Sequence, residues 1–250
     1  MRIIPVIDLM NGQVVRGVAG RRAEYRPIRS SIAADARPGT VARAFVERFG
    51  FETVYVADLD AILHHRLDLD GCANIAAAGL QLWLDAGVSN SDHSAEINGR
   101  LYKVGINPRL VVGLESLESE DSLREIHATC RQPPIFSLDM KDGKPISRIP
   151  AWEKHSPVEI AIAAYSAGLR NLIVLDLADV GANGGTRTRD LCRQIRQTAA
   201  FDKIVAGGGV RGVCDLEALA SAGCDAALVA SALHDGRLTK DEIRHVENLS

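Results

Sequence analysis

The chain has 250 residues, of which 46% are hydrophobic and 24% charged, and its formal net charge is −3. This charge argues against nucleic acid as the main partner, because no basic field would attract a phosphate backbone. No apolar run approaches the ~18 residues that span a bilayer, the five cysteines show no metal-ligand spacing, and no signal peptide is visible. We expect a cytoplasmic protein without membrane contact.

Short β-rich apolar runs alternate with amphipathic helical stretches along the chain. In chain order, strands are predicted over residues 3–7, 53–57, 80–84, 109–112, 135–138, 172–175, 203–206 and 226–229. Helices are predicted over residues 40–49, 70–78, 91–98, 119–130, 157–167, 188–198, 213–222 and 240–247. These strand–helix units predict one α/β domain over residues 1–250, a (β/α)8 TIM barrel, with a doubly wound open sheet as the alternative. Residues 17–38, rich in Arg and Pro, are a candidate active-site loop or lid.

One motif occurs twice, as an apolar run that ends in Asp and then breaks into a Gly turn. The copies read Ile7-Asp8-Leu9-Met10-Asn11-Gly12 and Leu138-Asp139-Met140-Lys141-Asp142-Gly143. The offset between the two Asp residues, 139 − 8 = 131, is about half the chain. We therefore predict two similar half-barrels, approximately residues 1–130 and 131–250, with Asp8 and Asp139 facing each other across the mouth.

Carboxylates end several predicted strands, at Asp8, Asp58, Asp85, Asp139 and Asp176. Asp is a poor strand residue but a common turn residue, so one such case would mean little. We favour a catalytic function for Asp8 and Asp139. Asp58 is interpreted as structural or substrate-positioning. For Asp176, a functional role and a purely structural role in the turn are equally supported.

Glycine marks a candidate anion site after the seventh predicted strand, in Gly207-Gly208-Gly209. Unshielded backbone N–H groups in such a loop bind anions, and the loops after strands seven and eight of a barrel commonly hold phosphate. The next unit ends in small residues, Val229-Ala230-Ser231-Ala232. The predicted phosphate-binding residues are Gly208, Gly209, Ala230 and Ser231.

These motifs resemble the histidine-biosynthesis isomerase and cyclase family over nearly the whole chain. The resemblance rests on Ile4-Pro5-Val6-Ile7-Asp8-Leu9 with Gly12-Gln13-Val14-Val15-Arg16, on Val56-Ala57-Asp58-Leu59-Asp60-Ala61, and on the segments around Asp139, Gly208 and Ser231. The stretch Pro150-Ala151-Trp152 is more similar to the isomerase branch, ProFAR isomerase, than to the cyclase. The resemblance implies Asp8 as general base and Asp139 as general acid of an Amadori rearrangement, with no metal and no cofactor. It also implies substrate contacts by Arg16, Asp58, Trp152 and Asp176, although Trp152 could equally anchor its loop.

Three departures from the family pattern concern the substrate. A family Thr falls on Leu175 or Asp176, and the first-half phosphate turn reads Asp85-Ala86-Gly87, with Glu115 in its partner turn. At ~4 Å and an effective dielectric near 20, each carboxylate beside a phosphate charge costs roughly 4 kcal/mol, which arginines of residues 17–38 would partly offset. We predict that this degenerate first-half site (Asp85, Gly87, Glu115) is lost, and that the ligand has one phosphate and a neutral, hydroxylated or cationic other end.

Three functions are compatible with the sequence. The first is an isomerase of an aminoaldose phosphate. The second is a paralogue of that enzyme acting on another, mono-phosphorylated metabolite in methanopterin-linked one-carbon metabolism. The third is a barrel that binds a phosphorylated metabolite without turnover, which would not need two opposed carboxylates. A cyclase is a weaker reading, since it needs a glutaminase partner. The oligomeric state does not follow from the sequence.

Overall fold

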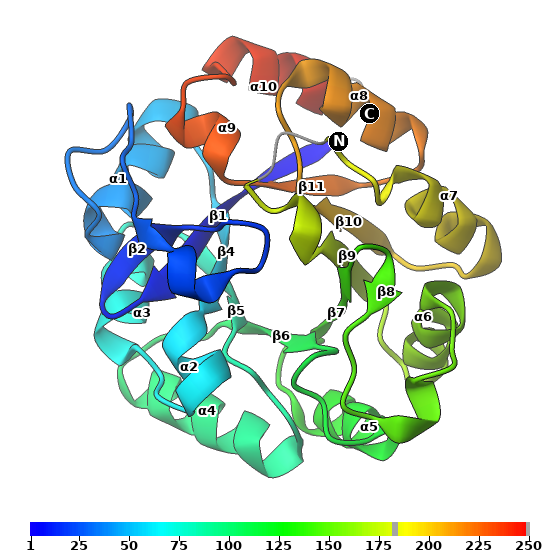
Figure 1. Ribbon diagram of the computed structural model, residues 1–250. Helices are drawn as coiled ribbons and strands as arrows, with labels where there is room; N and C mark the ends of the chain where they lie inside the picture. The colour runs from blue at the N-terminus through cyan, green and yellow to red at the C-terminus, as the bar shows by residue number, and fades with distance from the viewer. Residues whose placement is uncertain (182–184, 249–250) are drawn as a thin grey trace.

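A closed ring of parallel strands forms the centre of the computed structural model, which describes residues 1–181 and 185–248. Figure 1 shows the ring along its axis, with helices outside it. The barrel strands are β1 (Arg2–Met10), β4 (Thr53–Asp58), β5 (Gln81–Asp85), β6 (Arg109–Gly113), β7 (Ile135–Lys141), β9 (Asn171–Asp176), β10 (Lys203–Gly207) and β11 (Ala226–Val229). The ring closes because β1 pairs in parallel with β11, from Arg2 opposite Ala226 to Pro5 opposite Val229.

Helices surround the ring and connect successive strands, as right-handed parallel crossovers require. They are α1 (Pro38–Phe49), α3 (Leu69–Ala76), α4 (Ser91–Lys103), α5 (Glu120–Thr129), α6 (Pro157–Ser166), α7 (Arg189–Thr198), α8 (Val213–Ser221) and α10 (Lys240–Glu247). The predicted (β/α)8 TIM barrel is confirmed. Its construction from two similar half-barrels stays a prediction.

Local capping explains why several helices begin where the sequence predicts. The Ser156 hydroxyl accepts a hydrogen bond from the Glu159 N–H, and the Glu159 carboxylate accepts one from the Ser156 N–H, so α6 starts with a capping box. Thr239 and Glu242 form the same arrangement at α10. Each box satisfies backbone donors that a helix otherwise leaves free.

Each barrel strand is apolar on both faces, and the two faces belong to different parts of the core. On β4, Val54 and Val56 pack outward against the helices, whereas Tyr55 and Ala57 face the barrel interior. Side chains two residues apart share a face, so this alternation decides which strand-end residues enter the barrel mouth.

Short elements follow the barrel strands on the carboxyl-terminal side of the ring. They are β2 (Gln13–Arg16), β3 (Arg26–Pro27), β8 (Lys144–Pro145), α2 (Leu59–His64), α9 (Ser231–His234) and the 3-10 turns η1 (Arg22–Glu24), η2 (Pro150–Trp152) and η3 (Leu177–Asp179). Residues 17–38, predicted as one irregular loop, therefore contain η1 and β3. The Ala19 N–H donates to the Val180 carbonyl (2.7 Å) and the Ile28 N–H to the Val14 carbonyl (2.9 Å), which bind this segment to both sides of the mouth.

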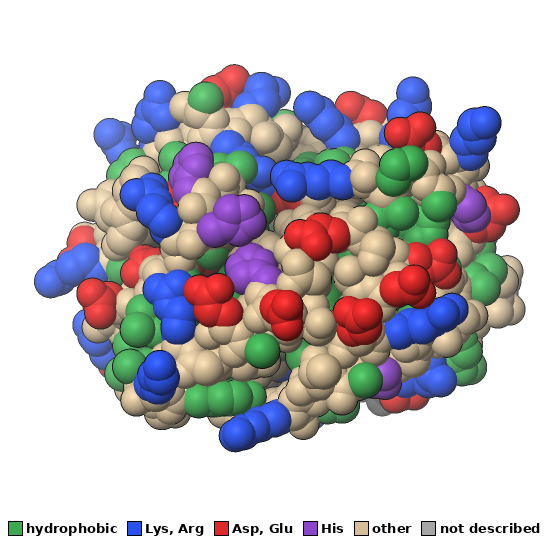
Figure 2. Space-filling view, turned by 90° about the horizontal axis from the view of Figure 1, so that it is seen from below, with side chains coloured by type: hydrophobic (Ala, Val, Ile, Leu, Met, Phe, Trp, Pro, Cys, Tyr) green, Lys and Arg blue, Asp and Glu red, His purple; other side chains and the backbone are tan. Residues whose placement is uncertain are grey.

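The outer surface mixes charges of both signs. Figure 2 shows one side of the molecule, on which Lys and Arg are interspersed with Asp and Glu. Among the helices that the structure describes, none has the length and apolar character needed to cross a membrane.

Candidate active site

A cavity of about 370 Å³ opens at the carboxyl-terminal ends of the strands. This is the end at which (β/α)8 enzymes place their catalytic groups. Of the residues predicted from the sequence, the following line it: Asp8, Arg16, Asp85, Glu115, Asp139, Gly208, Gly209, Ala230 and Ser231. The tertiary structure therefore brings the predicted catalytic pair and the predicted phosphate turn into one cavity.

Asp8 and Asp139 lie on opposite sides of this cavity. They stand on β1 and β7, which are four strands apart in the ring of eight. Burial raises the pKa of Asp8 to about 7, against a smaller lowering by the Arg22 guanidinium. Burial, followed by the nearby Glu115 and Asp85 carboxylates, raises the pKa of Asp139 well above its usual range, although the Ser137 hydroxyl donates to Asp139 Oδ1 at 2.6 Å.

A tyrosine beside Asp8 was not predicted from the sequence. A Cβ added to Gly17 would lie 3.3 Å from Asp8 Oδ2 and 3.6 Å from Tyr25 Oη, so both oxygens converge on this glycine. Burial and then the Asp8 charge raise the pKa of Tyr25 to about 12, so its phenol is a hydrogen-bond donor at neutral pH. Residues 17–38 thus contribute a polar group to the cavity, as their position after the first strand suggested.

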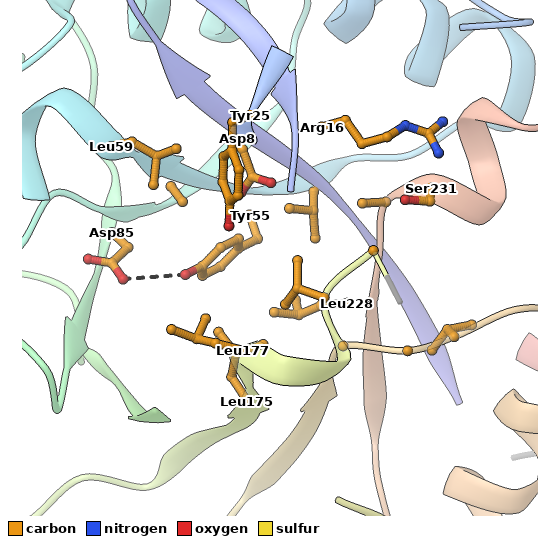
Figure 3. A pocket seen from close by; sticks show the side chains of 18 of the residues that line it. Asp8, Arg16, Tyr25, Tyr55, Leu59, Asp85, Leu175, Leu177, Leu228 and Ser231 are labelled. Atoms are coloured by element: carbon orange, nitrogen blue, oxygen red, sulfur yellow. Dashed lines mark hydrogen bonds between the residues drawn. The ribbon is translucent and has the colours of Figure 1, made fainter. Parts of the chain in front are cut away.

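Asp85 lies at the β5 side of the cavity and accepts two hydrogen bonds from neutral donors. The Tyr55 hydroxyl donates to Asp85 Oδ2 (3.3 Å) and the Gly87 N–H to Asp85 Oδ1 (3.0 Å). Burial is the main reason that the pKa of Asp85 is raised to about 7. Gly87 itself forms the turn behind the carboxylate and does not line the cavity. Figure 3 shows the Tyr55–Asp85 pair, with Asp8 and Tyr25 beside it.

Glu115, in the turn after β6, is paired with an arginine from the other side of the mouth. Arg22, in η1, donates to Glu115 Oε1 at 2.5 Å, and both side chains are mostly buried. An arginine of residues 17–38 thus lies beside a carboxylate of the first-half site, as the sequence analysis expected of the arginines that would offset its negative charge.

Small residues and arginines form the opposite end of the cavity. Gly209 has φ +78°, and a Cβ there would lie 2.1 Å from the Gly185 carbonyl oxygen, so only glycine fits. Arg16 pairs with Asp235 beside this turn. Figure 3 shows Arg16 and Ser231 on one side of the cavity and Asp85 on the other.

Asp58 and Asp176 end strands but do not line the cavity. By the alternation of side chains they face outward, on the same side of β4 and β9 as Val56 and Val174. Asp58 accepts from the Ala61 and Asp68 N–H groups, at 3.0 and 2.6 Å. Turn chemistry therefore accounts for its position.

Asp176 is bound still more extensively. Its carboxylate accepts from the N–H groups of Asp142 (3.1 Å), Gly143 (2.7 Å) and Ala178 (2.9 Å), which joins the β7–β8 turn to η3. Trp152 is 2% exposed in η2 and lines a different cavity, with Lys144 and His155. Their substrate contacts, like that of Asp58, stay predictions.

Further polar cavity residues that were not predicted from the sequence are Tyr55, Arg22, Asp235 and Arg237. Tyr55 reads as one more apolar residue in a buried strand, and only its place on the inward face gives it a polar function. Arg22 stands among the arginines of residues 17–38, and its partner Glu115 is 93 residues away. The composition of that segment is the one signal that pointed to it.

The cavity can hold an anion at one end and exchange protons at its centre. Opposed carboxyl groups whose pKa values are raised by burial suit a general base and a general acid. Among the described residues, no group of three or more His, Cys, Asp or Glu side chains is arranged to hold a metal ion. Fold and site together define a (β/α)8 barrel with a cavity at its carboxyl-terminal mouth that is lined by buried carboxyl groups.

Comparison with known proteins gives the family. Residues 2–239 match the model of the family described as histidine biosynthesis protein, and the chain belongs to that family. An uncharacterized protein of Methanocaldococcus jannaschii is 32% identical over 243 residues, 97% of this chain and 97% of that protein. A protein of Natronomonas pharaonis is 28% identical over 245 residues, 96% of this chain and 95% of its own length. That relative is named 1-(5-phosphoribosyl)-5-((5-phosphoribosylamino)methylideneamino) imidazole-4-carboxamide isomerase, or ProFAR isomerase. A Bacillus cereus protein of the same name is 23% identical over 254 residues, the full length of both chains.

Proposed function

We propose that the protein is an isomerase that converts an aminoaldose phosphate into an aminoketose by an Amadori rearrangement. The observation that carries the proposal is the placement of Asp8 and Asp139 on opposite strands of one cavity, each with a raised pKa. The names of the relatives from Natronomonas pharaonis and Bacillus cereus support an isomerase.

The two carboxyl groups divide the proton transfers. Asp139, whose pKa burial raises well above its usual range, holds its proton and gives it to the ring oxygen, so that the C1–O bond breaks and a Schiff base forms. Asp8, with a pKa of about 7, is partly ionised at neutral pH and removes the proton from C2. Return of this proton from Asp8 to C1, with loss of the C2 hydroxyl proton to the ionised Asp139, gives the aminoketose and restores both carboxyl groups. The product is therefore an isomer of the substrate, and no oxidant or reductant is consumed.

The phosphate of the substrate is assigned to the glycine-rich end of the cavity. Gly208, Gly209, Ala230 and Ser231 expose backbone there with little side-chain cover, which is the usual surface for phosphate in this fold. Arg16 lies on the same side and supplies positive charge.

A second candidate is a paralogue that acts on another, mono-phosphorylated metabolite, in methanopterin-linked one-carbon metabolism. This candidate is favoured by the carboxylates Asp85 and Glu115, which lie at the end of the cavity remote from the glycine-rich turn. A second phosphate at that end would be repelled by their negative charge. The substrate in the printed name of the isomerases has two phosphoribosyl groups. The uncharacterized protein of Methanocaldococcus jannaschii matches this chain over 97% of both lengths, so the same candidate substrates can be assayed with both proteins.

Turnover assays separate these candidates. The purified protein is given ProFAR and, separately, an N-aryl-5-phosphoribosylamine, which has the same aminoaldose and one phosphate. We expect conversion of the second compound, and loss of at least about 100-fold in kcat when Asp8→Asn or Asp139→Asn is introduced, with phosphate affinity retained. Asp121→Asn, on the exposed first turn of α5, is the control that should not change kcat.

Two results would contradict the proposal. If neither compound is converted while phosphate still binds, the protein is not an isomerase of these aminoaldose phosphates, and the paralogue with a different substrate is favoured. If the Asn variants keep wild-type kcat, the reaction does not use this carboxylate pair.

A further inference from the structure

The cavity is electrostatically asymmetric along its length. At the glycine-rich end, Arg16 and Arg237 both pair with Asp235. At the β5–β6 end, Asp85 and Glu115 face the cavity, and Arg22 is the cation on that side among the described lining residues. Arg22 pairs with Glu115, whereas the hydrogen bonds that Asp85 accepts from described residues come from the neutral Tyr55 hydroxyl and Gly87 N–H groups.

The carboxylates at this end are close together. A Cβ added to Gly113 would lie 2.9 Å from Asp139 Oδ2 and 3.4 Å from Asp85 Oδ2, so both oxygens converge over this glycine. With Asp139 protonated as the general acid and Glu115 neutralised by its arginine, ionisation of Asp85 leaves one uncompensated negative charge. A ligand with a single positive charge at this end would compensate it.

The burial of Arg22 shows that this end of the cavity accommodates a cation. The Arg22 guanidinium reaches it from η1 on the other side of the mouth, and its side chain is 24% exposed. A guanidinium is drawn into a partly buried site only where carboxylates offset its desolvation. The aromatic ring of Tyr55 lines the same end and offers a further surface that attracts cations.

We propose that the β5–β6 end of the cavity is a cation subsite, and that the substrate carries a protonated amine or guanidine at the end remote from its phosphate. Asp85 is the primary acceptor, and Glu115 with Arg22 forms the adjacent wall. The inference rests on the proposed function in one respect, the assignment of phosphate to the glycine-rich end.

Three series of synthetic ligands test this subsite in the full-length protein. They are ω-aminoalkyl phosphates, ω-hydroxyalkyl phosphates and alkanediol bisphosphates, with matched chains of about three to six carbons. Dissociation constants are measured by calorimetry. At the best chain length we expect the amine to bind about tenfold more tightly than the alcohol, because a hydrogen bond to a charged partner contributes that much. The bisphosphate should bind more weakly than the alcohol.

Variants locate the effect. Asp85→Asn should abolish the preference for the amine and leave the affinity for inorganic phosphate unchanged. Glu115→Gln, which leaves Arg22 without its carboxylate, should improve the affinity for the bisphosphate. Because Glu115 is partly exposed, this variant keeps the test informative should Asp85→Asn not fold.

The affinity for the amine should also rise between pH 6 and 8, as Asp85 ionises. The charged and titratable groups that interact with Asp85 are Tyr55 on β4, Glu115 in the turn after β6, Asp139 on β7 and Arg22 in η1. Asp8, on β1, interacts with Tyr55. Titration of these other groups affects the affinities of the amine and alcohol series alike. The ratio of the two affinities therefore isolates the interaction between Asp85 and the positive charge of the amine.

The outcomes distinguish this inference from the proposed function. Equal affinity for amine and alcohol, or tightest binding of the bisphosphate, overturns the cation subsite, even if the phosphoribosylamine is isomerised. A preference for the amine without any turnover supports the subsite and contradicts the isomerase. Binding of none of the three series would overturn the subsite and the phosphate assignment together.

Discussion

At the scale of single residues, the cavity depends on how each carboxylate is surrounded. Asp8 and Asp85 line the cavity, and burial raises the pKa of both to about 7, against a smaller lowering by the Arg22 guanidinium. Asp58 and Asp176 accept hydrogen bonds from backbone N–H groups outside the cavity. Carboxylates that look equivalent in the sequence therefore have different chemistry.

Arg22→Gln should shift the pH dependence of the proposed reaction. The guanidinium lowers the pKa of Asp8, so its loss should move the rise of kcat/KM with pH to higher pH by about one unit. The control is Arg21→Gln, which removes an exposed pair with Glu24 on the same turn. A pH–rate profile of the three proteins measures the shift, and identical profiles would contradict the assignment of Asp8 as base.

Asp176→Ala should destabilise the fold, because it leaves three backbone N–H groups without their acceptor. The expected decrease in the free energy of unfolding is on the order of 3 kcal/mol. Urea unfolding at pH 7 measures it. A variant of wild-type stability that has lost substrate affinity would instead place Asp176 in substrate binding, as the resemblance implied.

At the scale of elements, the short segments after the barrel strands form the cavity. The turn after β10 needs a left-handed backbone and has no room for a side chain at Gly209. Residues 17–38 cross the mouth and provide Arg22 and Tyr25. The barrel strands hold these turns at fixed positions, so their chemistry can change without a change of fold.

Gly209→Ala should therefore cost more stability than Gly12→Ala and should weaken phosphate binding. Both glycines have positive φ (+78° and +72°), so each substitution carries a backbone penalty of about 1–2 kcal/mol. A Cβ at Gly12 meets nothing within 4 Å, whereas one at Gly209 meets the Gly185 carbonyl. Urea unfolding and phosphate titration of both variants measure the difference. Equal losses would show that the turn can relax.

At the scale of the whole molecule, buried carboxylates link stability to pH. The pKa of Asp8 and that of Asp85 are about 7 in the folded protein, against an ordinary value of 3.8. Between these values the folded state binds more protons than the unfolded state, so the free energy of unfolding falls as pH rises from about 4 through 7.

Asp85→Asn should remove part of this decrease. The free energy of unfolding of the variant relative to the wild type should increase from pH 4 to 7 and become constant above about pH 8. Chemical unfolding across this range measures it, with the exposed Asp121→Asn as control. A difference that does not change with pH would contradict the raised pKa of Asp85.

Much of the architecture could be predicted because its signals are local. The alternation of β-rich apolar runs with amphipathic helical stretches identified the eight strand–helix units in order. The repeated Asp motif likewise predicted two carboxylates that the structure brings into one cavity. The short strands β2, β3 and β8 were missed, since elements of two to four residues carry little periodic signal.

The sequence by itself determined the barrel, the strand-end carboxylates and the glycine-rich turn. Only the tertiary structure decided which carboxylates enter the cavity. The physical reason is that strands of a parallel barrel are buried on both faces. The residues before Asp8 and before Asp58 are therefore apolar both on the side that faces the barrel interior and on the side that faces the helices. Without a polar face, the alternation does not reveal the inward side. The pairing of Arg22 with Glu115 also depends on barrel closure, because it joins segments that lie 93 residues apart.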